Sequence, residues 1–293
     1  MQLMKYCLTV CLVFSMSSLH ADDTEEGSSA ITFEIGQDTD DSQEAYLNVD
    51  TGLENGVHIK WMSGGTRLPA ESDIFETRSR SIGISSPYGK KVVAGFDYDY
   101  WGNPDTIETR TRRFKLGTNT EDWYVQLVYE DRVTRLRTNG SFINRRGVVV
   151  DLPDTADINS NGRGLDISFY GFFPFSINLS YMEYDYDKDL TAVAKHPDFL
   201  LILFPASTLS MTTGLESWRR SGDISYSFEW GTFGISGSQS ESVVDESIAS
   251  TGSLYLILDI NKNWSSTFTW GESGTDTSDE TVRFARLGIT HRW

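Results

Sequence analysis

Strict alternation of apolar and polar residues is the feature that most constrains what this chain can fold into. The stretch WYVQLVYED at 123–131 places Trp, Val, Leu and Tyr on one face and Tyr, Gln, Val and Glu on the other. Successive side chains of a β-strand point to opposite faces, so this stretch predicts a two-faced strand. The alternation recurs near 31–36, 45–50, 57–62, 92–100, 165–171, 223–230, 263–271 and 281–293, and no amphipathic helical pattern is sustained. The chain is therefore predicted to be all-β.

Two all-β architectures produce this pattern, and the lengths of the connections distinguish them. A soluble sandwich buries the apolar face, whereas a transmembrane barrel turns that face to lipid. Short connections at 53–56, 87–90, 119–122, 172–175, 230–232 and 261–263 alternate with mostly longer ones, of which the two longest are expected at about 132–163 and 187–216. Membrane barrels have short periplasmic turns and long extracellular loops, whereas a sandwich has no reason to keep the two kinds in phase. We therefore expect a closed antiparallel transmembrane β-barrel of about 14 strands, within a range of 12–16.

Tryptophans are placed as the barrel interpretation requires. Trp123, Trp230 and Trp264 lie beside short turns, while Trp61 and Trp270 lie farther along their strands. Aromatic residues form girdles at both interfaces of a membrane barrel. Trp123, Trp230 and Trp264 are expected to contribute to the periplasmic girdle. Trp61 and Trp270 are expected to contribute to the extracellular girdle.

The N-terminal segment has the layout of a secretory signal peptide. One lysine precedes an apolar run too short to span a membrane as a helix, and small residues and acids follow. We expect a signal peptide at 1–21, an acidic segment at 22–29 and the barrel at 30–293. Both cysteines, Cys7 and Cys11, fall within the first segment, so the mature chain has no disulfide and no thiolate metal site.

The charge of the chain excludes one class of partner. The whole chain carries 25 basic and 42 acidic residues, a formal charge of −17. Removal of 1–21 takes away only Lys5, which leaves 24 − 42 = −18. A chain this acidic is poor material for binding nucleic acid. Nothing in the sequence predicts a cofactor or a metal.

The last strand resembles the C-terminal signal of Gram-negative outer-membrane β-barrel proteins. The positions that carry the resemblance are Arg286, Gly288, His291 and Trp293, and His291 departs from the large apolar residue usual there. The resemblance implies the outer membrane as location and the barrel assembly machinery as a partner during biogenesis. It also implies that the last strand pairs with the first, at 31–36. Outer-membrane lipid and lipopolysaccharide are then further expected partners.

The face opposite the apolar one should line the barrel interior. Its charged members are expected to be Glu34, Asp50, His58, Lys60, Asp97, Asp99, Glu130, Asp166, Asp223, Glu229, Arg286 and Arg292. Eight-stranded barrels are filled by side chains, while those of 16–18 strands hold a water channel, and fourteen lies nearer the latter. Because acid outnumbers base in this set, we expect a porin-like passive channel for small hydrophilic solutes with a weak cation preference. The alternative is that the same charges form a salt-bridged plug.

Two other functions stay open at this stage. One is a non-transporting surface or envelope-structural barrel, acting in adhesion or as an export accessory. The other is an outer-membrane hydrolase, which needs a nucleophile beside a base. Among the mature histidines, His58, His196 and His291, only His196 lies where an external active site would be, and the G-x-S-x-G motif is absent. No catalytic residue is therefore assigned, and the chain is expected not to be an enzyme.

Three further segments carry hypotheses. Arg78, Arg80, Arg110, Arg112 and Arg113 are expected either to form a basic belt that meets lipid phosphates or to be a solvated face. The loop near 187–216 contains the apolar run FLLILFPAS, which predicts a constriction in the barrel mouth, an additional strand or a rim contact. The alternating acids of DYDKD resemble a calcium loop but lack its glycine and its final glutamate, so solvated charge is favoured.

Overall fold

The structure is a computed structural model that describes residues 28–69, 74–86, 91–137, 141–143, 149–151, 155–187, 215–244, 246–279 and 281–293. The strands that form its main sheet are β1 (Ser29–Asp38), β2 (Gln43–Gly52), β3 (His58–Pro69), β4 (Ile74–Ser85), β5 (Val92–Asn103), β6 (Ile107–Asn119), β7 (Trp123–Arg137), β10 (Thr155–Phe172), β11 (Phe175–Tyr186), β12 (Glu216–Phe228), β13 (Gly231–Ser242), β14 (Ile248–Asp259), β15 (Trp264–Thr275) and β16 (Thr281–Arg292). In the described part of the chain, no helix is long and apolar enough to cross a membrane.

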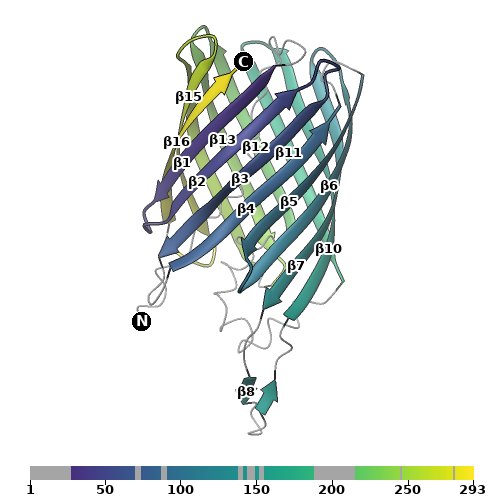
Figure 1. The fold of residues 1–293 in the computed structure, drawn as a ribbon, viewed down its shortest axis with the longest axis vertical. Coiled ribbons are helices and arrows are strands. Elements are labelled where there is room, and N and C mark those ends of the chain that lie inside the picture. Colours follow the sequence, from purple (N-terminus) through teal and green to yellow (C-terminus); the bar gives the residue numbers. More distant parts are fainter. Residues whose placement is uncertain are drawn as a thin grey trace.

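These strands form one closed antiparallel barrel (Figure 1). Each strand pairs with its neighbour in the sequence, and β1 pairs with β16 to close the ring. The backbones of Ser29 and Trp293 exchange two hydrogen bonds of 3.0 Å at the end of this seam. The prediction of a closed fourteen-stranded barrel is confirmed, as is the pairing of the first strand with the last.

The connections follow the predicted alternation, but some strands are longer than the sequence indicated. The stretch at 132–163 was expected to be a loop, whereas β7 continues to Arg137 and β10 begins at Thr155. A small separate hairpin, β8 (Ser141–Ile143) and β9 (Val149–Asp151), lies between them. The outward-facing side chains on this extension are mostly polar or charged, and Arg135 Nε donates to Asp157 Oδ1 at 2.7 Å. The hydrogen-bond ladder therefore continues beyond the apolar part of the strand.

The domain boundaries can be compared with the chain only from residue 28 onward. The predicted signal peptide at 1–21 and most of the acidic segment lie outside the described residues. β1 begins at Ser29, one residue before the predicted start of the barrel. The predicted apolar run at 199–207 and His196 also lie outside the described residues.

Exposure distinguishes the two faces of most barrel strands. On the outer face, Leu127 is 63% exposed and Leu116 57%, whereas the inward Ser265 is 1% exposed. The five predicted girdle tryptophans all face outward, with exposed fractions between 41% and 61%. The outer surface of the barrel thus carries an apolar band, and the polar half of each alternating strand lies inside.

The inner wall contains long side chains that cross a neighbouring strand. Tyr184 on β11 and Glu130 on β7 both pair with Gly162 of β10, which lies between them. The Tyr184 hydroxyl donates to Glu130 Oε2 at 3.0 Å, with its ring over Gly162. A Cβ atom on Gly162 would lie 2.6 Å from Tyr184 Cε1, closer than real Cβ contacts. The glycine is needed so that the ring can lie flat on the wall.

We call this arrangement a glycine bridge: a side chain crosses a glycine on the next strand and reaches a residue on the strand beyond. Three further bridges that end on a polar group occur among the described residues. They are Tyr46 across Gly64 to Ser79, Tyr255 across Gly234 to Asp223, and Arg286 across Gly36 to Glu44. The Tyr46 and Arg286 bridges each lie within one cross-strand row, whereas Asp223 lies two residues along β12 from the residue that pairs with Gly234. These bridges connect second-neighbour strands in addition to the backbone ladder.

Gly162→Ala should destabilise the barrel, because the added Cβ pushes Tyr184 away from Glu130. Overpacking of this kind costs about 1–3 kcal/mol. Urea unfolding of the refolded barrel, followed by tryptophan fluorescence, measures the change. Gly252→Ala on β14 is the matched control, since a Cβ there meets no atom within 4 Å. Equal stability of the two variants would contradict the bridge.

Candidate functional site: the barrel lumen

Most residues predicted to line the lumen occupy inward-facing positions. They are Glu34, Asp50, His58, Lys60, Asp97, Asp99, Glu130, Asp166, Asp223 and Arg286, each alternating with neighbours on the outer face. Arg292 lies at the periplasmic end of β16, where its guanidinium is 3.7 Å from Asp259 Oδ1 and about half exposed. Glu229 is a correction, because β12 ends at Phe228 and Glu229 lies exposed in the following turn. The prediction extended the alternation of β12 one residue beyond the end of the strand.

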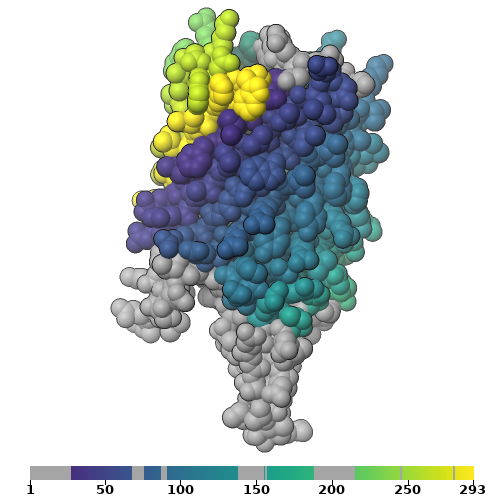
Figure 2. All heavy atoms as spheres, viewed as in Figure 1, coloured from purple at the N-terminus to yellow at the C-terminus, as the bar shows by residue number. Residues whose placement is uncertain are grey.

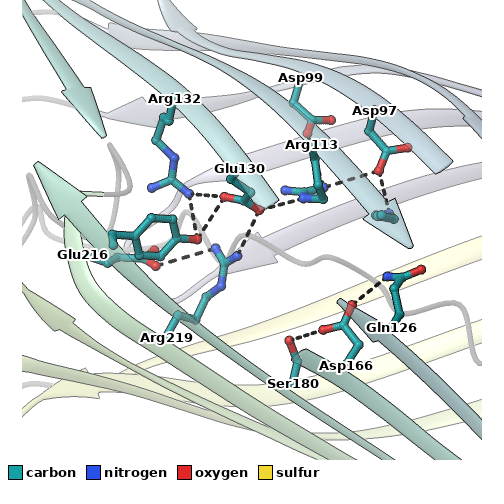
Figure 3. Close-up of polar contacts among 12 residues, drawn as sticks. Asp97, Asp99, Arg113, Gln126, Glu130, Arg132, Asp166, Ser180, Glu216 and Arg219 are labelled. Carbon is teal, nitrogen blue, oxygen red and sulfur yellow. Dashed lines mark hydrogen bonds and ion pairs between the residues drawn. The ribbon is translucent and has the colours of Figure 1, made fainter. Parts of the chain in front are cut away.

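Glu130 is the centre of a dense charged cluster on the wall (Figure 3). Its carboxylate accepts hydrogen bonds from Arg113 Nε at 2.6 Å and from an Arg132 terminal nitrogen at 3.0 Å. Arg219 Nη2 lies 3.7 Å from the same carboxylate, and the Tyr184 hydroxyl completes the shell. Glu130 is 1% exposed. Three guanidiniums from β6, β7 and β12 therefore converge on one buried carboxylate.

The cluster continues in both directions along the ring. Toward β5, Arg113 lies 3.7 Å from Asp97 and 3.4 Å from Asp99, and Lys115 lies 2.6 Å from Asp97. Toward β12, Arg219 lies 3.6 Å from Glu216. Most of these charges are close to a charge of opposite sign, so the cluster as a whole is nearly balanced.

Sequence reasoning missed the basic half of this cluster. Arg113 was grouped with Arg110 and Arg112 as either an outer belt or a solvated face, but it faces the lumen and is 7% exposed. The residues TRTRRF alternate on β6, so consecutive arginines must point to opposite faces. Counting back from the outward Phe114 and Leu116 places Arg113 on the inner face and Arg112 on the outer face. Arg132, Arg219, Glu216 and Tyr184 lie in stretches that were interpreted as loops or left unassigned.

Two inner carboxylates have no basic partner within the described chain. Asp166 accepts from Gln126 Nε2 at 2.9 Å and from the Ser180 hydroxyl at 2.6 Å (Figure 3). Asp223 accepts from Asn178 Nδ2 at 3.1 Å and bonds with Tyr255. All four donors are neutral. The negative charge of Asp166 and Asp223 is therefore not cancelled locally, unlike that of Asp97 or Glu130.

A second charged group lies near β1–β3 and the seam. Asp50 lies 3.0 Å from His58 Nδ1 and 3.4 Å from Lys60 Nζ. Arg286, which is 4% exposed, contacts Glu44 and lies 3.8 Å from Glu34. The ion pair of Arg286 with Glu44 joins the last strand to the second across the closing seam.

The wall formed by β13–β15 is different in character. Its inward positions are mostly small hydroxyl-bearing residues and glycines, and Ser236 and Ser253 share a hydrogen bond of 2.6 Å. Ser265 and Ser273 are each 1% exposed. Side chains this short project little into the lumen. The barrel interior therefore has a bulky charged wall over β5–β12 and a thin hydroxyl wall beside it.

The two described histidines lie on different faces of the barrel wall. His58 faces Asp50. Ser85 pairs with His58 across the two strands, and its Oγ has no hydrogen-bond partner. His291 points outward and stacks between Trp264 and Trp293, with ring centroids 4.4 Å and 5.6 Å away. No group of three or more metal-ligating side chains was found among the described residues.

The predicted assembly signal is divided between the two faces. Arg286 and Gly288 face the lumen, while His291 and Trp293 face outward at the end of β16. Stacking on two tryptophans gives His291 an aromatic environment at a position where a large apolar residue was expected. Recognition of these residues by the assembly machinery stays a prediction.

Known structures share this architecture. The CymD monoaromatic hydrocarbon channel matches 92% of this chain with 89% of its own, at 8% identity and a TM-score of 0.54. The chain has the porin-like fold of an outer-membrane β-barrel. A KdgM porin, solved with disordered oligogalacturonate, matches 89% of this chain with 98% of its own, at 10% identity and a TM-score of 0.43. The NanC porin matches 89% of this chain with 98% of its own, at 8% identity and a TM-score of 0.44. No protein-family model and no curated protein matches the sequence.

Glu130→Gln should destabilise the barrel strongly, because it removes the charge that three guanidiniums share in a buried site. Loss of one partner of such a group costs about 3–5 kcal/mol. Urea unfolding measures the effect. Asp131→Asn, the next residue on the outer face, is the matched control. Its pair with Arg112 is 3.5 Å long and exposed, so its loss should cost about 1 kcal/mol or less. Similar losses for both variants would refute the central role of Glu130.

Proposed function

We propose that this barrel is a passive outer-membrane channel for small hydrophilic solutes. The observation that carries the proposal is a closed ring of fourteen strands whose inner face is predominantly polar and charged. Eight strands leave an interior that side chains fill, whereas 16–18 leave a water channel. We infer that a fourteen-stranded ring with short side chains over β13–β15 has space for solutes beside the charged wall.

The ion pairs support a lined channel rather than a salt-bridged plug. The most widely separated pair described above joins Arg219 on β12 to Glu130 on β7, which are three strands apart in the ring. The others lie within one strand or join neighbouring or second-neighbour strands. Such pairs lie along the wall, whereas a plug would need bonds between opposite sides of the barrel.

The weak cation preference follows from which charges are compensated. Asp97, Asp99 and Glu130 are paired with Arg113, Lys115 and Arg132, and paired charges attract ions little. Asp166 and Asp223 accept hydrogen bonds only from neutral groups. Charge of one sign that lines a low-dielectric cleft concentrates counter-ions. These two carboxylates are our candidates for the residues that attract cations.

The alternatives are a non-transporting surface or export-accessory barrel and an outer-membrane hydrolase. The hydrolase is disfavoured because Ser85 Oγ, opposite His58, makes no hydrogen bond and His291 stacks between two tryptophans. The CymD structure of this fold is moreover a channel. We therefore propose that the chain is not an enzyme. Small solutes, outer-membrane lipid and, during biogenesis, the assembly machinery are its proposed partners.

Asp166→Asn with Asp223→Asn should bring the cation-to-anion permeability ratio toward one, by about twofold at 0.1 M salt, where screening is incomplete. Reversal potentials of the refolded barrel in a planar bilayer under a salt gradient measure this ratio. Asp97→Asn should change it less, because Lys115 and Arg113 already compensate Asp97.

Asp131→Asn makes the same kind of charge change on the outer face and should leave the ratio unaltered. An equal shift in this control would remove the role given to Asp166 and Asp223. A barrel that inserts and shows heat-modifiable mobility but conducts no current would overturn the channel itself, and would favour the non-transporting alternative.

A further inference from the structure

The outer surface over β4–β6 changes from apolar to basic at a sharp boundary. On β4, the outward Ile84 and Ile82 are followed by Arg80 and Arg78. On β6, with increasing distance from the short turn at 119–122, Leu116 and Phe114 are followed by Arg112 and Arg110. These apolar residues are 49–57% exposed, as expected for a lipid-facing band. The arginines therefore begin where the hydrocarbon region ends and lipid headgroups start.

We call Arg78, Arg80, Arg110 and Arg112 the outer arginine cluster. Arg80 and Arg110 both pair with Tyr100 on β5, which lies between them in one cross-strand row. Neighbouring strands are about 4.8 Å apart, so the backbones of Arg80 and Arg110 are roughly 10 Å apart. Two arginine side chains span that gap easily. This part of the barrel surface faces the reader in Figure 2.

The cluster is short of acidic partners. Arg110 donates to Glu108 at 3.1 Å, but Glu108 also lies 3.6 Å from Arg135 and 3.9 Å from Arg137. Arg112 is 63% exposed and reaches Asp131 only at 3.5 Å.

Arg78 and Arg80 are exposed and form no ion pair with any described residue. This patch is therefore locally positive on a chain whose formal charge is −17.

We propose that the outer arginine cluster binds the phosphate groups of lipid headgroups in the outer leaflet. Guanidiniums present planar pairs of N–H donors that match phosphate oxygens, and such charge-assisted bonds are about twice as strong as neutral ones. The cluster adjoins the apolar band and faces away from the lumen, which selects an anchored lipid rather than a solute in transit. The proposal depends on the outer-membrane setting of the barrel and not on conduction.

Lipid binding can be measured by native mass spectrometry on the refolded barrel in detergent, with diphosphorylated lipid A as the probe. Arg78→Gln with Arg80→Gln should weaken binding by about tenfold or more, because two charged phosphate contacts are lost. Arg220→Gln with Arg283→Gln is the matched control. It removes two outward arginines from β12 and β16 and should leave the affinity within about twofold of the unmodified barrel.

The phosphate itself is tested on the unmodified barrel, so the proposal stays falsifiable if a variant fails to fold. Lipid A stripped of both phosphates should bind about tenfold more weakly. Equal binding of the two lipids, or equal losses in the two double variants, would overturn the proposal. Heat-modifiable mobility confirms that each variant has folded. A barrel that does not conduct but retains phosphate-dependent lipid binding would contradict only the proposed channel function.

Discussion

Closure of the sheet is the constraint on which everything else in this barrel depends. Backbone N–H and C=O groups in a bilayer have no water to bond with, so an open sheet edge is not tolerated. The pairing of β1 with β16 removes that edge. Once the ring is closed, the alternation of each strand assigns every side chain either to lipid or to the lumen. The strongly acidic composition then has to be accommodated largely on the inner wall and beyond the apolar band.

The inner wall accommodates its charges by spreading them over several strands. Glu130 is surrounded by donors from β6, β7, β11 and β12, and each donor on the more distant strands has to cross a neighbour. Glycines make those crossings possible, since a glycine removes the side chain that would block the path. Where donors are neutral instead, as around Asp166 and Asp223, a charge is left that an ion in the lumen would experience.

The sequence was sufficient to predict the architecture because alternation and turn length are local properties. It was also sufficient to place Asp97 and Glu130 on the inner face, because their strands have an unambiguous apolar face. It failed at Glu229, because alternation does not show where a strand ends, and at Arg113, because a run of arginines was treated as one patch. The contact of Tyr184 with Glu130 could not be predicted, since it depends on the register of three strands and on the placement of Gly162 between them.

The Arg286 bridge has a consequence for the order of assembly. Its guanidinium belongs to the final strand, whereas the carboxylate of Glu44 belongs to the second, more than two hundred positions earlier in the chain. The two can meet only after β16 has come to rest against β1 in the native register, with Gly36 beneath the side chain. A pairing displaced by one residue would point Arg286 at the hydrocarbon. This ion pair therefore forms only in a correctly completed ring, and it penalises a ring that is closed out of register.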